Sequence, residues 1–63
     1  MTLFTFFKYM DLGAQLEIYD RACNFIDKGV RGTIDLPDKL LETKVNLFIP
    51  GIVTMIYLNM ELV

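Results

Sequence analysis

The sequence contains no histidine, no tryptophan and a single cysteine, Cys23, among its 63 residues. One cysteine cannot form an internal disulfide, and without histidine it cannot complete the ligand set of a structural zinc site. A catalytic thiol also needs a neighbouring base, most often a histidine. The sequence therefore predicts a protein that is not an enzyme and that holds neither a metal nor another cofactor.

Charged residues make up 22% of the chain, and its six basic and eight acidic side chains give a net charge of −2. Binding a nucleic-acid backbone normally requires a basic stripe. Only Arg21, Lys28 and Arg31 are placed to form a small basic patch. A nucleic-acid-binding regulator is therefore retained as an alternative function, but nucleic acid is not the favoured partner.

Apolar residues, in contrast, are abundant and make up 54% of the chain. A chain of this length forms one small domain, residues 1–63. The core of so small a domain rarely supplies more than about 3–5 kcal/mol, and its surface is large relative to its volume. The apolar surplus therefore predicts buried contacts with another chain or, less favoured, with a membrane.

Residues 15–28 follow the 3.6-residue period of an amphipathic helix, with the polar side chains on one arc and Gly29 at the C-terminal end. The apolar arc is wide enough for two neighbours, and we expect Cys23 to be buried within it. One seam, spaced alternately by three and four residues, begins before the helix. The residues predicted to mediate self-association here are Tyr9, Leu12, Leu16, Tyr19, Cys23 and Ile26, with Ile18 and Phe25 on a second seam.

Residues 37–48 predict a second helix, and its apolar spacing continues through Phe48, Ile52 and Met55, which join the predicted self-association set. Pro50 lacks an amide hydrogen and is expected to kink or break this arm. The favoured fold class is therefore all-α. A helical hairpin pairs residues 3–28 with residues 37–62, and several copies associate into a multi-helix bundle.

The two ends of the chain allow a second interpretation. Residues 2–10 and 52–62 are rich in β-branched and aromatic side chains, which are typical of strands. The alternative fold is a small α+β domain with terminal strands and one covering helix at residues 15–28.

Residues 45–60 carry no charge, but this run is shorter than the roughly 18–20 residues that a spanning helix needs. A small membrane-associated subunit using residues 45–63 is therefore an alternative, and a cytoplasmic location is expected. The favoured function is a small non-enzymatic interaction or regulatory protein. It would act as a homo-oligomer, a dimer or higher, that contacts itself and another protein. Its size is typical of viral or plasmid accessory proteins.

Overall fold

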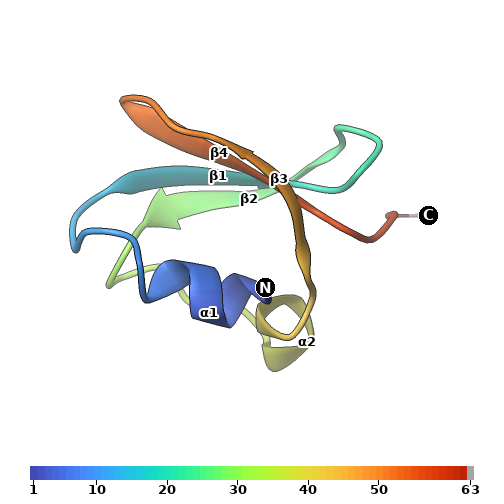
Figure 1. Cartoon of the computed structure of the whole chain (residues 1–63), viewed down its shortest axis with the longest axis horizontal. Coiled ribbons are helices and arrows are strands. Elements are labelled where there is room, and N and C mark those ends of the chain that lie inside the picture. The colour runs from blue at the N-terminus through green and yellow to red at the C-terminus, as the bar shows by residue number, and fades with distance from the viewer. Residues whose placement is uncertain (63) are drawn as a thin grey trace.

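The computed structural model describes residues 1–62 and contains two short helices and four strands. Figure 1 shows both helices on the same side of the sheet. In chain order the elements are α1 (Leu3–Phe7), β1 (Gln15–Tyr19), β2 (Phe25–Val30), α2 (Asp38–Leu41), β3 (Val45–Ile49) and β4 (Val53–Leu58). The chain is therefore a small α+β domain dominated by its sheet.

The strands lie in the order β2-β1-β4-β3. The two central strands, β1 and β4, are parallel, with Ile18 opposite Ile56. Each central strand pairs with an antiparallel edge strand, β2 beside β1 and β3 beside β4. Two hairpins that are distant in sequence thus join along the parallel pair into one mixed sheet.

The prediction of an all-α helical bundle is wrong, because residues 15–28 form the β1–β2 hairpin instead of a helix. Leu16 and Ile18 are buried, whereas Glu17 and Tyr19 on the same strand are only partly covered, which is the two-residue period of a strand. Apolar residues in a short segment can fit the helical and the strand period at once. The two helical association seams therefore do not exist.

The predicted second helical arm is also wrong. Only Asp38–Leu41 is helical, and β3 and β4 follow it. Pro50 lies just beyond the end of β3, where the chain turns back toward β4, and it interrupts no helix. Neither helix within residues 1–62 has the length and hydropathy that crossing a bilayer requires.

The alternative α+β prediction has the correct fold class, but only one of the three elements that it proposed is present. The C-terminal strand corresponds to β4, whereas the predicted N-terminal strand is helix α1. Thr2 begins that helix, since its Oγ1 accepts a hydrogen bond from the backbone N–H of Thr5 at 3.2 Å. No covering helix forms at residues 15–28.

The core lies between the helices and the inner face of the sheet. Burying one large apolar side chain contributes roughly 1.5–3 kcal/mol. Phe6 of α1 also contacts Phe48 of β3, with ring centroids 4.8 Å apart. The buried core side chains are Leu3, Phe6, Phe7, Leu16, Ile18, Leu36, Ile56 and Leu58.

Candidate functional site

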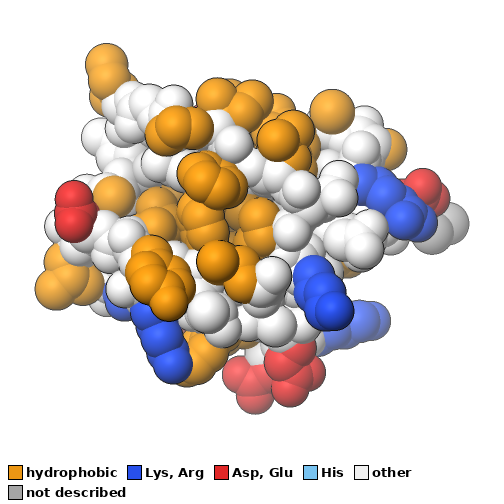
Figure 2. Space-filling model, in the orientation of Figure 1, with side chains coloured by type: hydrophobic (Ala, Val, Ile, Leu, Met, Phe, Trp, Pro, Cys, Tyr) orange, Lys and Arg blue, Asp and Glu red, His pale blue; other side chains and the backbone are white. Residues whose placement is uncertain are grey.

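The face of the sheet that points away from the helices has no covering layer among the elements of residues 1–62 (Figure 1). In a sheet covered on one side only, the outward positions are usually polar. The register here places mostly apolar side chains on them, and Figure 2 shows hydrophobic side chains exposed along the upper part of the molecule. We define the outer face as Tyr19, Phe25, Val30, Leu47, Ile49, Val53, Met55 and Tyr57, with only Gln15, Glu17 and Lys28 polar.

An aromatic row crosses three strands of the outer face. The Tyr19 ring stacks on Tyr57, with centroids 5.2 Å apart and planes at 21°. On its other side it meets the edge of Phe25 at 5.8 Å and 76°. Leu47, opposite Tyr57 on β3, extends the row to the fourth strand. Both end residues, Phe25 and Leu47, are 53% exposed, so the row is an accessible apolar surface.

The polar residues of the outer face lie beside this row and include both signs of charge. Glu17 and Lys28 are opposite one another in the β1–β2 register. The Tyr19 hydroxyl donates a 2.7 Å hydrogen bond to Glu17 Oε1. This hydrogen bond to a carboxylate raises the pKa of Tyr19 above its ordinary value of 10.0, with smaller contributions from burial and nearby charge. The phenol therefore holds its proton in this hydrogen bond to the carboxylate.

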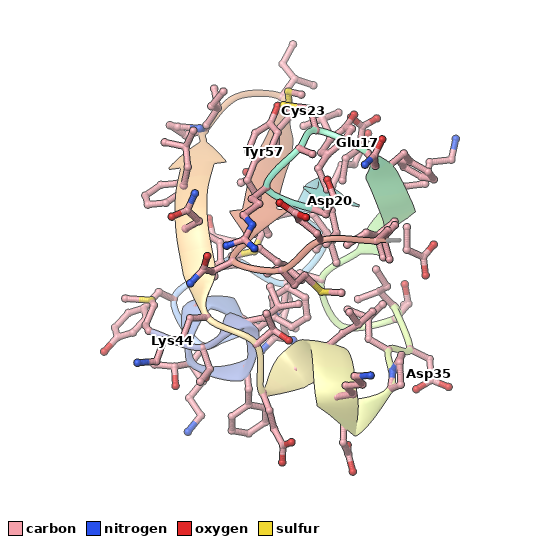
Figure 3. All side chains as sticks on the ribbon, turned by 90° about the vertical axis from the view of Figure 1, so that its right-hand side faces the viewer. Glu17, Asp20, Cys23, Asp35, Lys44 and Tyr57 are labelled. Atoms are coloured by element: carbon pink, nitrogen blue, oxygen red, sulfur yellow. The ribbon has the colours of Figure 1, made fainter. Side chains whose placement is uncertain are left out.

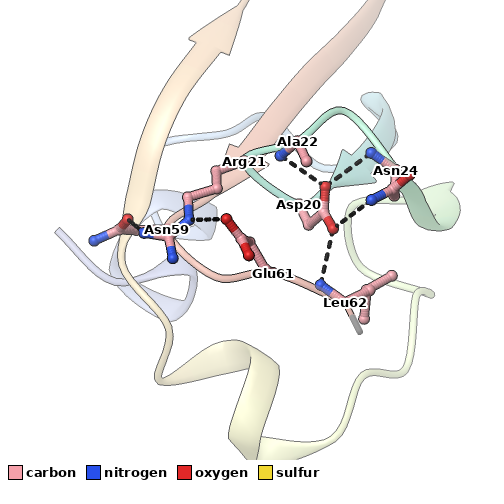
Figure 4. A network of polar contacts seen from close by, with 7 residues as sticks. All are labelled: Asp20, Arg21, Ala22, Asn24, Asn59, Glu61 and Leu62. Atoms are coloured by element: carbon pink, nitrogen blue, oxygen red, sulfur yellow. Dashed lines mark hydrogen bonds and ion pairs between the residues drawn. The ribbon is translucent and has the colours of Figure 1, made fainter.

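Asp20 is a buried acid, but its environment gives it a structural role. Its carboxylate accepts four hydrogen bonds, all 2.8–2.9 Å long (Figure 4). Burial alone would raise its pKa, but the bonds from the Leu62 amide, the Asn24 side chain and amide and the Ala22 amide outweigh burial and lower the pKa to about 2. Asp20 is therefore ionised at neutral pH, and both of its carboxylate oxygens accept hydrogen bonds. These bonds connect the β1–β2 turn to the C-terminal segment.

Arg21 adds an exposed contact between the same turn and the C-terminal segment. Its Nε lies 3.1 Å from Glu61 Oε1, and its Nη1 donates to Asn59 Oδ1 at 3.4 Å. Arg31, at the opposite end of β2, donates from Nε to the carbonyl oxygen of Phe7 at 2.7 Å. These two arginines therefore do not join Lys28 in a single basic patch.

The predicted self-association residues are divided among several environments. Leu16 and Ile18 belong to the core, Ile26 packs against it, and Phe48 lies at the sheet edge against Phe6. Cys23, expected to be buried, is exposed in the β1–β2 turn with a φ of 68°. Tyr9, Leu12 and Ile52 are exposed outside the strands, and the outer face contains Tyr19, Phe25 and Met55.

The remainder of the outer face was missed because it depends on strand period. Val53, Met55 and Tyr57 alternate with Thr54, Ile56 and Leu58 along β4. The β-branched and aromatic content of this segment is the signal that could have identified Tyr57 as an outward residue.

No group of three potential metal ligands occurs within residues 1–62. Figure 3 shows the charged side chains of Glu17, Asp35 and Lys44 spread around the molecule. The surface hollows have volumes of about 210, 300 and 280 Å³, at or below the lower end of the roughly 300–1,000 Å³ typical of ligand pockets.

The fold and its surface together define a small α+β domain with one covered and one open sheet face. No family model, curated protein or solved structure matches the chain. The most distinctive surface feature of the described residues is the exposed apolar row on the outer face.

Proposed function

We propose that this chain is a non-enzymatic interaction protein that acts as a homo-oligomer, its copies meeting through the outer face of the sheet. The observation that carries the proposal is the row formed by Phe25, Tyr19, Tyr57 and Leu47, which is apolar where a solvated face would be polar. A sheet that is apolar on both faces needs a layer on each of them. The helices supply one layer and a second copy supplies the other.

A second copy is a chemically suitable partner for this face. Aligned sheets pack about 10 Å apart with their side chains interdigitated, and flat aromatic rings suit such a contact. The outer face contains one acidic and one basic side chain, Glu17 and Lys28. In a twofold contact the acid of one copy can therefore approach the base of the other, and no like-charged cluster opposes association.

The proposal is tested by measuring molar mass with light scattering across a range of concentrations. The wild-type protein is expected to exceed its monomer mass of 7.3 kDa. Met55→Lys is expected to lower the associated mass, because it places a charge in the middle of the apolar face. The new ammonium lies opposite Glu17 in the β1–β4 register, so the fold itself is expected to tolerate it.

Leu12→Lys is the matched control, since Leu12 is 78% exposed and lies between α1 and β1, away from the outer face. It makes the same change in charge and nearly the same change in size, and it is expected to leave the mass unchanged. A wild-type protein that stays at one chain up to millimolar concentration would contradict the proposal. An undiminished mass for folded Met55→Lys would also contradict it.

A further inference from the structure

The two edges of the sheet are built differently. An edge strand exposes unpaired backbone amides and carbonyls, which can pair with a strand of another chain. Natural proteins protect such edges with charges, bulges and local hydrogen bonds. The edges here are β2 and β3; both contain a bulge, but only β2 also has charged side chains and local hydrogen bonds beyond its bulge.

The β2 edge is closed by its own residues. A bulge interrupts its pairing next to Ile18 and Tyr19 of β1. Asp27 Oδ1 accepts a hydrogen bond from the backbone N–H of Lys28 at 2.8 Å. The Val30 carbonyl accepts from the amides of Thr33 and Ile34 at 3.0 and 2.9 Å. Charged side chains and engaged backbone groups thus discourage another strand from adding to β2.

The β3 edge is closed only at its start. Residues 1–3 run alongside it, where the Val45 amide donates to the Met1 carbonyl at 2.8 Å and the Leu3 amide donates to the Thr43 carbonyl at 2.9 Å. Residues 46–49 carry no charge, and within residues 1–62 no side chain or turn hydrogen-bonds to their backbone. The second half of β3 is therefore an open, uncharged edge.

We infer that this open edge is a second self-association site, at which the β3 strands of two copies pair antiparallel about a twofold axis at Phe48. The bulge between Val45 and Leu47 shifts the alternation of the strand by one residue. After Val45, Phe48 is then the next residue whose amide and carbonyl point away from β4. Two copies of Phe48 can exchange both backbone hydrogen bonds across the axis.

The side chains suit this register on both faces of the sheet. Phe48 of one copy lies opposite Phe48 of the other on the inner face. Leu47 lies opposite Ile49 of the second copy on the outer face, and the reverse pair repeats the contact. Apolar cross-strand pairs of this kind stabilise neighbouring strands. Because β2 is protected, β3 pairs with β3 and the contact closes as a dimer instead of propagating as a fibre.

Edge pairing also explains how an outer face of this size can support association, and in this respect the inference rests on the proposed function. Four strands at about 4.8 Å spacing and about 3.3 Å per residue give a footprint of roughly 350 Å². A stable interface buries about 800 Å² per partner. Joining two sheets through β3 doubles the footprint to about 700 Å². Two such pairs then pack their outer faces, which gives an assembly of four chains.

The inference is tested by exchanging charges at Phe48. This side chain is 48% exposed, so both Phe48→Lys and Phe48→Glu are expected to fold, and circular dichroism checks this. Each variant alone places like charges opposite one another on the axis and is expected to lose edge pairing. An equimolar mixture places opposite charges there and is expected to recover the wild-type mass. A mixture that stays at the mass of the separate folded variants, or a single variant that keeps the wild-type mass, would overturn the inference.

Amide hydrogen exchange tests edge pairing in the wild-type protein, so its result does not depend on how a substitution affects folding. The Phe48 amide is expected to exchange more slowly as protein concentration rises, whereas the Glu42 amide, which donates to the Asp38 carbonyl at the end of α2 and lies outside both contact sites, is expected to keep its rate. A Phe48 rate that does not depend on concentration in an associated sample would overturn edge pairing.

The outer-face variant separates failure of this inference from failure of the proposed function. With both sites present, Met55→Lys is expected to leave a dimer of two chains joined through β3. A monomer would mean that the edge site is absent while the outer face still mediates association. An unchanged mass would count against the outer face alone.

Discussion

The inner and outer faces of the same sheet contain similar side chains, but only one of them is covered. Ile18, Ile56 and Leu58 on the inner face are completely buried under the helices. On the outer face of the same strands, Tyr19, Met55 and Tyr57 are only partly covered by their neighbours. The helices therefore cover the apolar side chains of the inner face, whereas no element of residues 1–62 covers those of the outer face.

The total exposed area does not reveal this difference. The chain exposes 4297 Å², close to the roughly 4,200 Å² expected of a monomer of its mass. What is unusual is the kind of surface that remains exposed and its concentration on one face. Contiguous apolar patches of several hundred Å² commonly mark interaction sites.

The largest loss of stability is expected from truncating a side chain on the inner face. Ile56→Ala removes three carbon atoms from a fully buried site, and the resulting cavity is expected to cost about 2–5 kcal/mol of unfolding free energy. Met55→Ala on the adjacent outward position is expected to cost less than about 1 kcal/mol. Urea denaturation at concentrations where the chain is monomeric measures both. Equal losses would mean that the two faces are equally covered.

A smaller loss of stability is expected from substituting Asp20, the polar residue at the end of the inner face. Asp20 follows Ile18 in the inward series, and its folded pKa of about 2 lies below its ordinary value of 3.8. Its ionised form therefore stabilises the fold fully above pH 3.8, and this contribution is lost as pH falls through about 2. Asp20→Asn is expected to lower the thermal midpoint at pH 7, because an amide NH₂ would face donors.

The pH dependence between 4 and 2 distinguishes this role from a general loss of stability. Asp20→Asn is expected to flatten the midpoint–pH curve in that window. Asp35→Asn, at an exposed position without a hydrogen-bond partner within residues 1–62, is the control and is expected to keep the wild-type slope. An unchanged slope for Asp20→Asn would show that another group controls the acid sensitivity.

The smallest effect is expected on the outer face, at the hydrogen bond from Tyr19 to Glu17. Glu17→Gln removes the carboxylate, so the pKa of Tyr19 is expected to fall back toward 10.0. Glu42→Gln, on the exposed side of the end of α2, serves as the control. The titration is followed through the ring resonances of Tyr19 by NMR. A Tyr19 pKa that is the same in both variants would place the phenol away from Glu17.

The sequence correctly predicted that some apolar side chains are buried, but not the secondary structure that buries them. Leu16 and Ile18 were expected to be buried and are, but in a strand of a sheet instead of a helical seam. The choice between the two was decided by pairing of β1 with β4, which lies far along the chain and leaves no local signal. Tertiary context of this kind commonly overrides a local periodic pattern.

The β1–β2 turn did leave a signal that could have corrected the helix. Asp20 and Asn24 flank it, and both residue types favour turns because their side chains bond to nearby backbone. Asp20 makes such bonds to the amides of Ala22 and Asn24, and Cys23 adopts a positive φ between them. Strand period could have identified single outward residues such as Tyr57, but not the outer face as a whole, because its residues come from four strands whose order the sequence does not reveal.

The most direct test of the outer face as the contact surface is an isotope-filtered NOE experiment on a mixture of labelled and unlabelled protein. Contacts between chains are expected from the Met55 methyl group and the Tyr19 and Tyr57 rings, and none from the buried Leu36. An associated sample in which these outer-face groups give no contacts between chains would contradict the account.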